Sequence, residues 1–330
     1  MLRYSATSPS AGTMAEIVAK KTPGKVDPFG TGKVLVVDCL SPFPAEVTDP
    51  FLMLHAFGPA HISAMPTFGM HPHRGFCEVP YLKKGKWYAT DPWNMRGEGE
   101  DAKMLEGQCG AGARPDVIPN FPPLPRGHSR TKSSARSLPM HARCSRRLQF
   151  GKAGRGIEHG MRKDEVYDGL VQGFQMWVNL KSENKLDPPV FQNARPDALP
   201  LLLLSPKAKA KLLVGTLQGQ ASPVDSFGVD CVYTDYMLEN GGEASCARTP
   251  AQVSAFAYVY EGKGTLGVSG TVVAAGETVR FGPVGDLVFK ADQGSNLGVM
   301  VLVGTPLKEP IIQRAQLRRT NESRAVSCRS

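Results

Sequence analysis

The stretch HPHRGF, at residues 71–76, constrains this chain more than any other. Pro72 disfavours the helical backbone for the residue before it and pushes His71 towards an extended conformation. Side chains alternate between the two faces of an extended strand, so His71 and His73 point to the same face. Two imidazoles on one face can bind one metal ion, although such pairs are also common on protein surfaces. The stretch therefore predicts a strand that carries a candidate metal site.

The distribution of histidine limits where that site can lie. The seven histidines occupy positions 55, 61, 71, 73, 128, 141 and 159, and none follows. His55 and His61 lie beside an apolar run, where single histidines are typically structural. His159 follows a glycine-rich turn that predicts entry into another strand. Any imidazole-based site must therefore lie in the first half of the chain.

Turn-forming residues occur throughout the sequence. Thirty-five glycines and twenty-seven prolines favour short strands over long helices. Residues 49–57 form a mostly apolar run that is typical of a core strand. Residues 174–180 alternate, with apolar side chains at the even positions and Gln175, Trp177 and Asn179 on the other face. The polar face is a candidate lining for the cavity beside the metal, although Trp177 is equally suited to an ordinary core. A chain of 330 residues is long enough for two domains of this kind.

The second half of the chain loosely repeats the first. The pattern Y-x-x-x-G ends an apolar run at residues 81–85 and again at residues 258–262. Where the first half has a histidine before a proline, the second half has Thr249. The repeat predicts a second β domain that binds no metal.

Four motifs in order carry a family resemblance: DPFLML at 49–54, HPHRGF at 71–76, AGRGI-x-H at 153–159 and GFQMWVNL at 173–180. Together they resemble the pirin family, whose members are two-domain proteins of the cupin superfamily. The likeness runs from about residue 49 to residue 313. It implies an all-β fold, with two jelly-roll (cupin) β-barrels packed in one chain.

The resemblance also implies one Fe²⁺ per chain, held in the N-terminal barrel. Carried over residue by residue, the family's histidine ligands fall on His71, His73 and His159. Its glutamate ligand falls on Met161, and a thioether suits Cu⁺ better than Fe²⁺. The first expectation is therefore a three-histidine site with open water positions.

Glu78 is the alternative fourth ligand or base. It follows His73 by five residues and precedes Gly85 by seven, which is similar to the general cupin spacing. Strict alternation along one strand puts Glu78 on the wrong face, but a bulge at residues 74–75 restores it. Glu158 is a poorer candidate, since it neighbours His159 and faces the opposite way.

The function implied by the resemblance is that of a quercetin 2,3-dioxygenase, acting on a flavonol-like substrate with O₂. No catalytic residue is assigned from the sequence. One alternative is a non-enzymatic, iron-binding cofactor of a nuclear transcription factor, and another is a metal-free protein. We expect a monomer that binds neither nucleic acid nor a membrane.

The basic charge of the chain belongs to one segment. Nine Lys and Arg and no acid lie between residues 117 and 157, and without them thirty Lys and Arg balance thirty Asp and Glu. The wider range 86–150 shows no sustained periodicity, so it is predicted to be an irregular basic insertion in the first barrel. A basic arm for nucleic acid or an acidic partner is the alternative, but no Phe, Trp or Tyr interleaves the basic residues between positions 126 and 147.

The predicted domains follow from these segments. Residues 1–25 are a disordered tail or a transit segment, 26–181 the N-terminal barrel, 182–200 a linker, 201–313 the C-terminal barrel and 314–330 a second tail. Seven scattered cysteines without a C-x-x-C pair are typical of a reducing compartment. We therefore expect the cytoplasm, the nucleus or both, with organelle import as the alternative.

Overall fold

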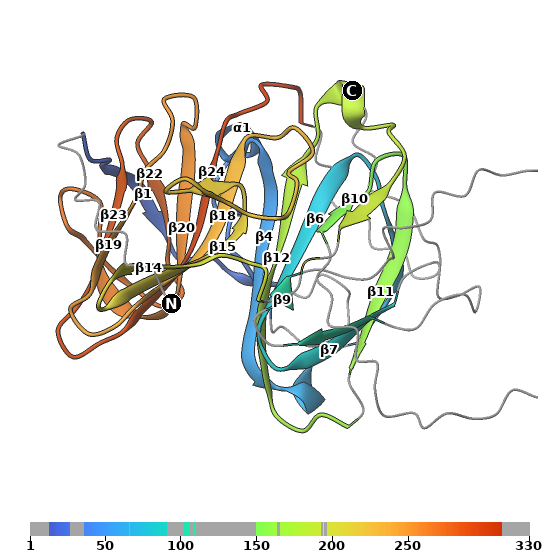
Figure 1. The fold of residues 1–330 in the computed structure, drawn as a ribbon, viewed down its shortest axis with the longest axis horizontal. Helices are drawn as coiled ribbons and strands as arrows, with labels where there is room; N and C mark the ends of the chain where they lie inside the picture. Colours follow the sequence, from blue (N-terminus) through green and yellow to red (C-terminus); the bar gives the residue numbers. More distant parts are fainter. Residues whose placement is uncertain are drawn as a thin grey trace, which may run out of the picture.

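The computed structural model describes residues 13–26, 36–65, 67–90, 102–105, 108–109, 150–163, 166–192, 194 and 197–311. These residues form two lobes made almost entirely of β-strands (Figure 1). Strands coloured blue to green build the lobe that contains β4 and β12, and strands coloured yellow to red build most of the other (Figure 1). The exception is the dark-blue β1 (Ile17–Lys21), which lies beside β22 in the second lobe (Figure 1). The prediction of an all-β chain with two barrels is confirmed.

The N-terminal lobe contains two antiparallel sheets. The eight-stranded sheet has the spatial order β13 (Val190–Gln192), β10 (Phe150–Lys152), β6 (Phe76–Lys84), β12 (Leu170–Asn179), β4 (Phe51–His61), β3 (Val36–Asp38) and β2 (Lys25–Val26), with β9 (Gln108–Cys109) paired to β6. The four-stranded sheet has the order β5 (Phe68–His73), β11 (Ile157–Lys163), β7 (Lys86–Thr90) and β8 (Ala102–Leu105).

The C-terminal lobe is built around a ten-stranded sheet. Its main path is β1 (Ile17–Lys21), β22 (Thr278–Phe281), β20 (Ser254–Leu266), β24 (Leu297–Gly304), β18 (Cys231–Leu238), β15 (Ala208–Val214) and β14 (Leu201–Ser205). Off this path, β20 pairs with β21 (Thr271–Ala274) and β23 (Leu287–Ala291), and β23 pairs with β19 (Glu243–Cys246). A separate hairpin joins β16 (Thr216–Leu217) to β17 (Gln220–Ala221).

Helices are single turns in the described ranges, namely α1 (Ala45–Thr48), η1 (Ile62–Ala64) and η3 (Ser182–Asn184). None of the helices described has the length and hydropathy needed to cross a membrane.

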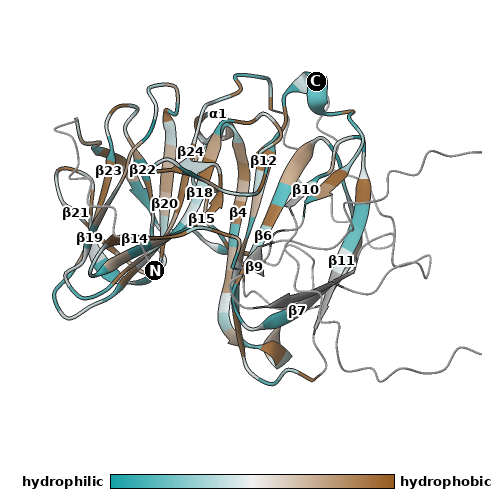
Figure 2. Cartoon of the chain, viewed as in Figure 1, coloured by the Kyte–Doolittle hydropathy of each residue, from teal (hydrophilic) through white to brown (hydrophobic). Residues whose placement is uncertain are grey.

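One apolar core lies between the two lobes. Alternate residues of β6 and β12 point into it, as period-two alternation requires. Figure 2 shows stretches of brown, the colour of hydrophobic residues, along β4, β6 and β12, and all three strands supply side chains to that core. The shared cluster includes Leu54, Cys77, Val79, Tyr81, Phe174, Met176, Val178, Tyr233, Phe256, Met300 and Leu302, all buried. Burying each such side chain contributes about 1.5–3 kcal/mol, so the lobes stabilise one another.

The N-terminal segment is not a disordered tail throughout. β1 pairs antiparallel with β22 at the edge of the C-terminal sheet. Ala15 is fully buried in the core of the C-terminal barrel, and Ile17 packs against it. The prediction for residues 1–25 is therefore wrong for 13–25, because a short apolar run gains a distant partner strand. Residues 1–12 lie outside the described part of the chain.

Two further predicted boundaries change. Strands β7, β8 and β9 fall within residues 86–150, so the prediction of an irregular segment is wrong for those strands. β7 pairs with β11, from Gly160 opposite Thr90 to Lys163 opposite Trp87. This pairing with a distant strand gives β7 a regular structure that its own sequence does not predict. Residues 110–149, with most of the basic charge, lie outside the described residues. In the predicted linker, β13 pairs with β10 and so belongs to the N-terminal sheet.

A buried carboxylate ties the lobes together within the apolar interface. Asp235 on β18 has no exposed surface. It accepts hydrogen bonds from Tyr81 Oη at 2.8 Å and Lys83 Nζ at 2.7 Å, both on β6. Tyr260 Oη on β20 donates to its other oxygen at 2.6 Å. The charge of Asp235 is thus paired and fully hydrogen-bonded, which is the condition under which a buried charge is tolerated.

We predict that Asp235→Ala destabilises the protein by about 3–5 kcal/mol, because it leaves the Lys83 ammonium and two tyrosine hydroxyls without their acceptor. The measurement is the free energy of unfolding in guanidinium. Glu243→Ala is the matched control: it removes an exposed pair with Lys290 and should change stability by less than about 1 kcal/mol. Equal effects of the two substitutions would contradict the assignment.

Candidate metal centre

Two neighbouring strands carry the three candidate histidines. His71 and His73 lie on β5, and His159 lies on β11. The strands pair antiparallel, with His159 opposite His71 and Ile157 opposite His73. Because His71 and His73 share one face of β5, this register brings the imidazole of His159 to the same place. His73 and His159 are each only 5% exposed.

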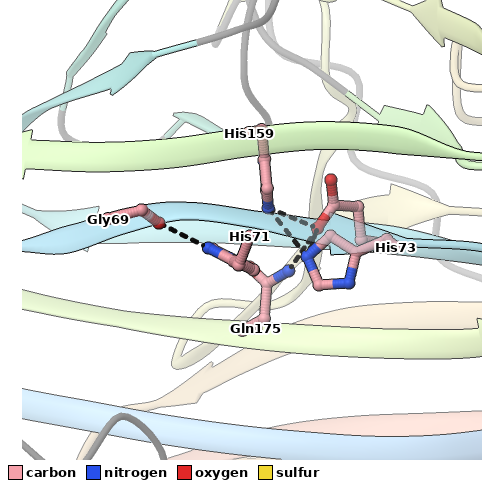
Figure 3. Close-up of polar contacts among 6 residues, drawn as sticks. Gly69, His71, His73, His159 and Gln175 are labelled. Carbon is pink, nitrogen blue, oxygen red and sulfur yellow. Dashed lines mark hydrogen bonds and ion pairs between the residues drawn. The ribbon is translucent and has the colours of Figure 1, made fainter. Parts of the chain in front are cut away.

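The imidazole nitrogens of the three histidines converge. Nε2 of His73 lies 2.9 Å from Nε2 of His159. The candidate ligand atoms of His71, His73 and His159 all lie within 4.8 Å of one another. Figure 3 shows the imidazoles turned towards one another from the two strands. Ligand atoms around one cation at about 2.1 Å stand roughly 3 to 4 Å apart, so the arrangement is compatible with a shared ion.

A backbone carbonyl sets the tautomer of His71. Nδ1 of His71 lies 2.7 Å from the carbonyl oxygen of Gly69, as the dashed line in Figure 3 marks. A carbonyl oxygen can only accept, so Nδ1 carries the proton. Nε2 is left with its lone pair for a metal, as in many metal-binding histidines whose other ring nitrogen donates to a backbone carbonyl.

Burial keeps the imidazoles neutral. It lowers the pKa of His73 to about 3, with a smaller contribution from the neighbouring charge of His71. Burial also lowers the pKa of His159 well below its usual value, with His73 and His71 adding to the effect. The pKa of His71 is lowered by burial too. At neutral pH all three side chains are therefore in the form that binds metals.

Glu78 also faces the histidines, from β6. Its Oε2 lies 3.6 Å from Nε2 of His73 and 3.3 Å from Nε2 of His159. Gln175 Nε2 on β12 donates a hydrogen bond to the same oxygen at 3.2 Å. Glu78 is 2% exposed, and burial raises its pKa to about 8, with the hydrogen bond from Gln175 opposing the shift.

The expected bulge at residues 74–75 is a complete turn. β5 ends at His73 and β6 begins at Phe76 in the other sheet, with Gly75 at a φ of +79° between them. Glycine suits this left-handed backbone because it has no Cβ. Alternation along one strand consequently does not apply to Glu78.

The remaining candidates lie as follows. Glu158 is exposed, on the face of β11 opposite the buried His159, as alternation predicts. For Met161 the backbone pairs with Phe68, after a register shift that begins at His159; its side chain lies outside the described part of the chain. His55 lies 3.8 Å from Asp38 and His61 lies 2.9 Å from Asp168, so neither joins the cluster.

Sequence patterns indicate one further feature of the site and miss another. Gln175 and Trp177 share a strand face, but only the register of β12 with β6, in which Trp177 lies opposite Glu78, brings that face to the histidines. The Trp177 ring lies 5.2 Å from the ring of His73. Gly69 contributes only its backbone oxygen, and no side-chain pattern could identify it.

The donors present fit a divalent transition metal. Three neutral imidazoles and one carboxylate form a mixed nitrogen and oxygen set that Fe²⁺, Ni²⁺ and Zn²⁺ accept. Within the described residues, Nδ1 of the buried His159 has no hydrogen-bond partner. The close approach of two Nε2 atoms and a carboxylate oxygen is natural around a cation, because each then directs a lone pair at it.

Comparison with known proteins finds similarity to pirins and to proteins named as quercetin dioxygenases. Residues 233–316 match the family described as Pirin C-terminal cupin domain. The chain is 28% identical over 277 residues to a Pseudomonas aeruginosa protein named "Putative quercetin 2,3-dioxygenase", covering 81% of this chain and 79% of that protein. It is 27% identical over 306 residues to Pirin-1 of Arabidopsis thaliana, covering 91% of this chain and 87% of that protein.

A solved structure shares the fold. It is the quercetin 2,3-dioxygenase from Acinetobacter baumannii, which aligns with a TM-score of 0.69 and 18% identity over 92% of this chain and 91% of that one. The predicted cupin architecture is thus confirmed.

We predict that the stability of the metal-free protein depends on pH through Glu78. Its folded pKa is raised to about 8, so the folded state keeps a proton that the unfolded chain loses near pH 4.3. The resulting stability is complete at low pH and is lost as the pH rises to about 8. The histidines, with lowered pKa values, act in the opposite direction and mainly below pH 6.5.

The measurement is the melting temperature of wild-type protein and Glu78→Gln between pH 6.5 and 9 in the presence of a chelator. The wild type should lose stability relative to the variant up to about pH 8, and the difference should then level off. Parallel curves over the whole range would contradict the buried, protonated state of Glu78.

Proposed function

The chain belongs to the pirin family of the cupin superfamily, and from this premise we propose that it is a metal-dependent dioxygenase of the quercetin 2,3-dioxygenase type. The proposed cofactor is one Fe²⁺ per chain in the N-terminal barrel, and the proposed substrates are a flavonol-like compound and O₂. The convergence of three neutral imidazoles within 4.8 Å carries the proposal. The dioxygenase name of one relative supports the reaction type.

His71, His73 and His159 are the proposed metal ligands, with Glu78 as the fourth. The distances from Oε2 of Glu78 to two Nε2 atoms, 3.6 and 3.3 Å, are those expected between ligands of one ion. A cation nearby favours the charged carboxylate, so Glu78 would ionise on metal binding. Glu78 would then take the place of the family glutamate that falls on Met161.

When bound, Fe²⁺ with open coordination positions can bring a chelating substrate and O₂ together. The residues of this chain orient the reactants. Gln175 holds Oε2 of Glu78 in position through its hydrogen bond. The half-buried ring of Trp177, beside His73, offers a flat apolar surface for a planar substrate. The implied reaction is cleavage of the flavonol ring with release of carbon monoxide.

We predict that His71→Ala, His73→Ala and His159→Ala each abolish stable metal binding, because each removes one of three nitrogen ligands. The purified wild type should carry about one metal ion per chain, measured by elemental analysis after reconstitution with Fe²⁺ under anaerobic conditions. His61→Ala is the control, since His61 is exposed and bonds to Asp168 instead, and it should bind metal normally. A metal-free wild type would overturn the proposed function.

We predict that the iron-loaded wild type consumes quercetin in air and releases carbon monoxide, and that Glu78→Gln lowers both metal affinity and turnover. Removal of an anionic ligand should weaken binding by at least tenfold, as measured by competition with a chelator. Full metal affinity with a turnover reduced about 10²–10⁴-fold would instead assign Glu78 as the base.

A wild type that binds metal and leaves quercetin intact would contradict the dioxygenase proposal. That result would favour the iron-dependent binding role, with a nuclear transcription factor as partner. The metal analysis and the carbon monoxide measurement therefore separate the two functions.

A further inference from the structure

We infer that Lys185, in the segment Ser182–Asp187 after β12, is a positioning residue that sets the geometry of the three-histidine site. This inference rests on the proposed metal function. Lys185 bonds to Gly75 and Asn179. It acts on the two turns from which the histidine-bearing strands extend.

The first of these turns joins β5 to β6. Lys185 Nζ donates to the carbonyl oxygen of Gly75 at 2.9 Å and to Oδ1 of Asn179 at 2.5 Å. Asn179 is buried at the end of β12 and lies opposite Phe76 in the sheet. The side chain of Lys185 thus connects the turn that follows His73 to a fixed point in the eight-stranded sheet.

The second turn joins β10 to β11, which carries His159. The backbone nitrogen of Gly75 donates to the carbonyl oxygen of Gly154 at 2.8 Å, so the two turns are directly bonded. The carbonyl oxygen of Asp187 accepts from Arg155 N at 2.9 Å. Its carboxylate accepts from Lys152 Nζ at 3.0 Å. The segment that contains Lys185 therefore holds both turns.

Close packing leaves little room for the turn at Gly154 to move against the segment Ser182–Asp187. Gly154 has a φ of +48°, and a Cβ there would stand 2.3 Å from the carbonyl oxygen of Asp187. On its other side, the segment is anchored to the C-terminal part of the chain, because the carboxylate of Glu309 accepts from Ser182 N at 2.9 Å. The segment is fixed at both ends and bridges the two turns in between.

The consequence for the metal site follows from the short distance along the strands. His73 precedes Gly75 by two residues, and His159 follows Gly154 by five. A shift of one turn relative to the other would move His73 relative to His159, whose Nε2 atoms are 2.9 Å apart. Metal affinity depends on such distances within a few tenths of an ångström. Lys185 should therefore act on metal binding more than on folding.

The test compares Lys185→Met with Lys181→Met in the full-length protein. Lys185→Met keeps most of the length of the side chain and removes the donor, while Lys181 is an exposed lysine directly before the segment. We expect Lys185→Met to weaken Co²⁺ binding by about tenfold to a hundredfold, measured by competition with a chelator. The visible spectrum of the Co²⁺ protein should change as well, and Lys181→Met should match the wild type in both.

Two further variants allow a result even if Lys185→Met does not fold. Lys185→Arg retains a donor and should recover part of the lost affinity. Lys152→Met removes the bond from Lys152 to Asp187, and should weaken Co²⁺ binding in the same direction even if Lys185→Met does not fold. The melting temperature of each metal-free variant reports its folding separately from its metal affinity.

The inference is overturned if folded Lys185→Met and Lys152→Met bind Co²⁺ with the wild-type affinity and spectrum. It is equally overturned if binding is lost only in proportion to the folded fraction, since the role would then be structural. A wild type that binds no metal would remove the proposed function and this inference together. A wild type that binds metal, with variants that bind equally well, would remove the inference alone.

Discussion

The apolar interface between the two barrels determines which side chains reach the metal site. On β6 the odd-numbered residues Cys77, Val79 and Tyr81 are buried between the lobes. Alternation then turns Glu78 to the opposite face, towards the histidines. The same holds on β12, where the even-numbered residues enter the interface and Gln175 and Trp177 face inwards. A slip of one residue in either strand would bury a carboxyl or an amide among the apolar residues and is therefore excluded.

This constraint explains how much of the site could be predicted from the sequence. The shared face of His71 and His73 follows from the spacing and from Pro72, and the alternation of residues 174–180 predicts the polar face that carries Gln175. The choice of His159 rested on a family resemblance, because its pairing with His71 depends on strand register across 88 residues. Glu78 was a candidate from its cupin-like spacing, but the cause of its placement was not predicted, since a tight turn at Gly75, and not a bulge within one strand, carries the chain into the second sheet.

Non-local strand pairing also explains why β1 and β7 were wrongly predicted to be disordered or irregular. The strands β1 and β7 are short, and their own sequences give weak signals. Each is stabilised by a partner far along the chain: β22 for β1 and β11 for β7. Strand propensity depends on such neighbours more than helix propensity does, so an isolated segment can read as irregular and still be ordered in the fold.

The second barrel has no histidine, yet it contributes to the first in two ways. Asp235 holds β6, the strand of Glu78, through Tyr81 and Lys83. Glu309 holds the segment at Ser182, which leads to Lys185 and to the turn after His73. In both contacts a carboxylate of the C-terminal lobe accepts hydrogen bonds from the N-terminal half of the chain, at some distance from the histidines. A buried site that keeps three imidazoles neutral and close together needs rigid support, because the desolvated donors would separate without it. The second barrel is therefore best understood as the scaffold that holds the ligand-bearing strands in register.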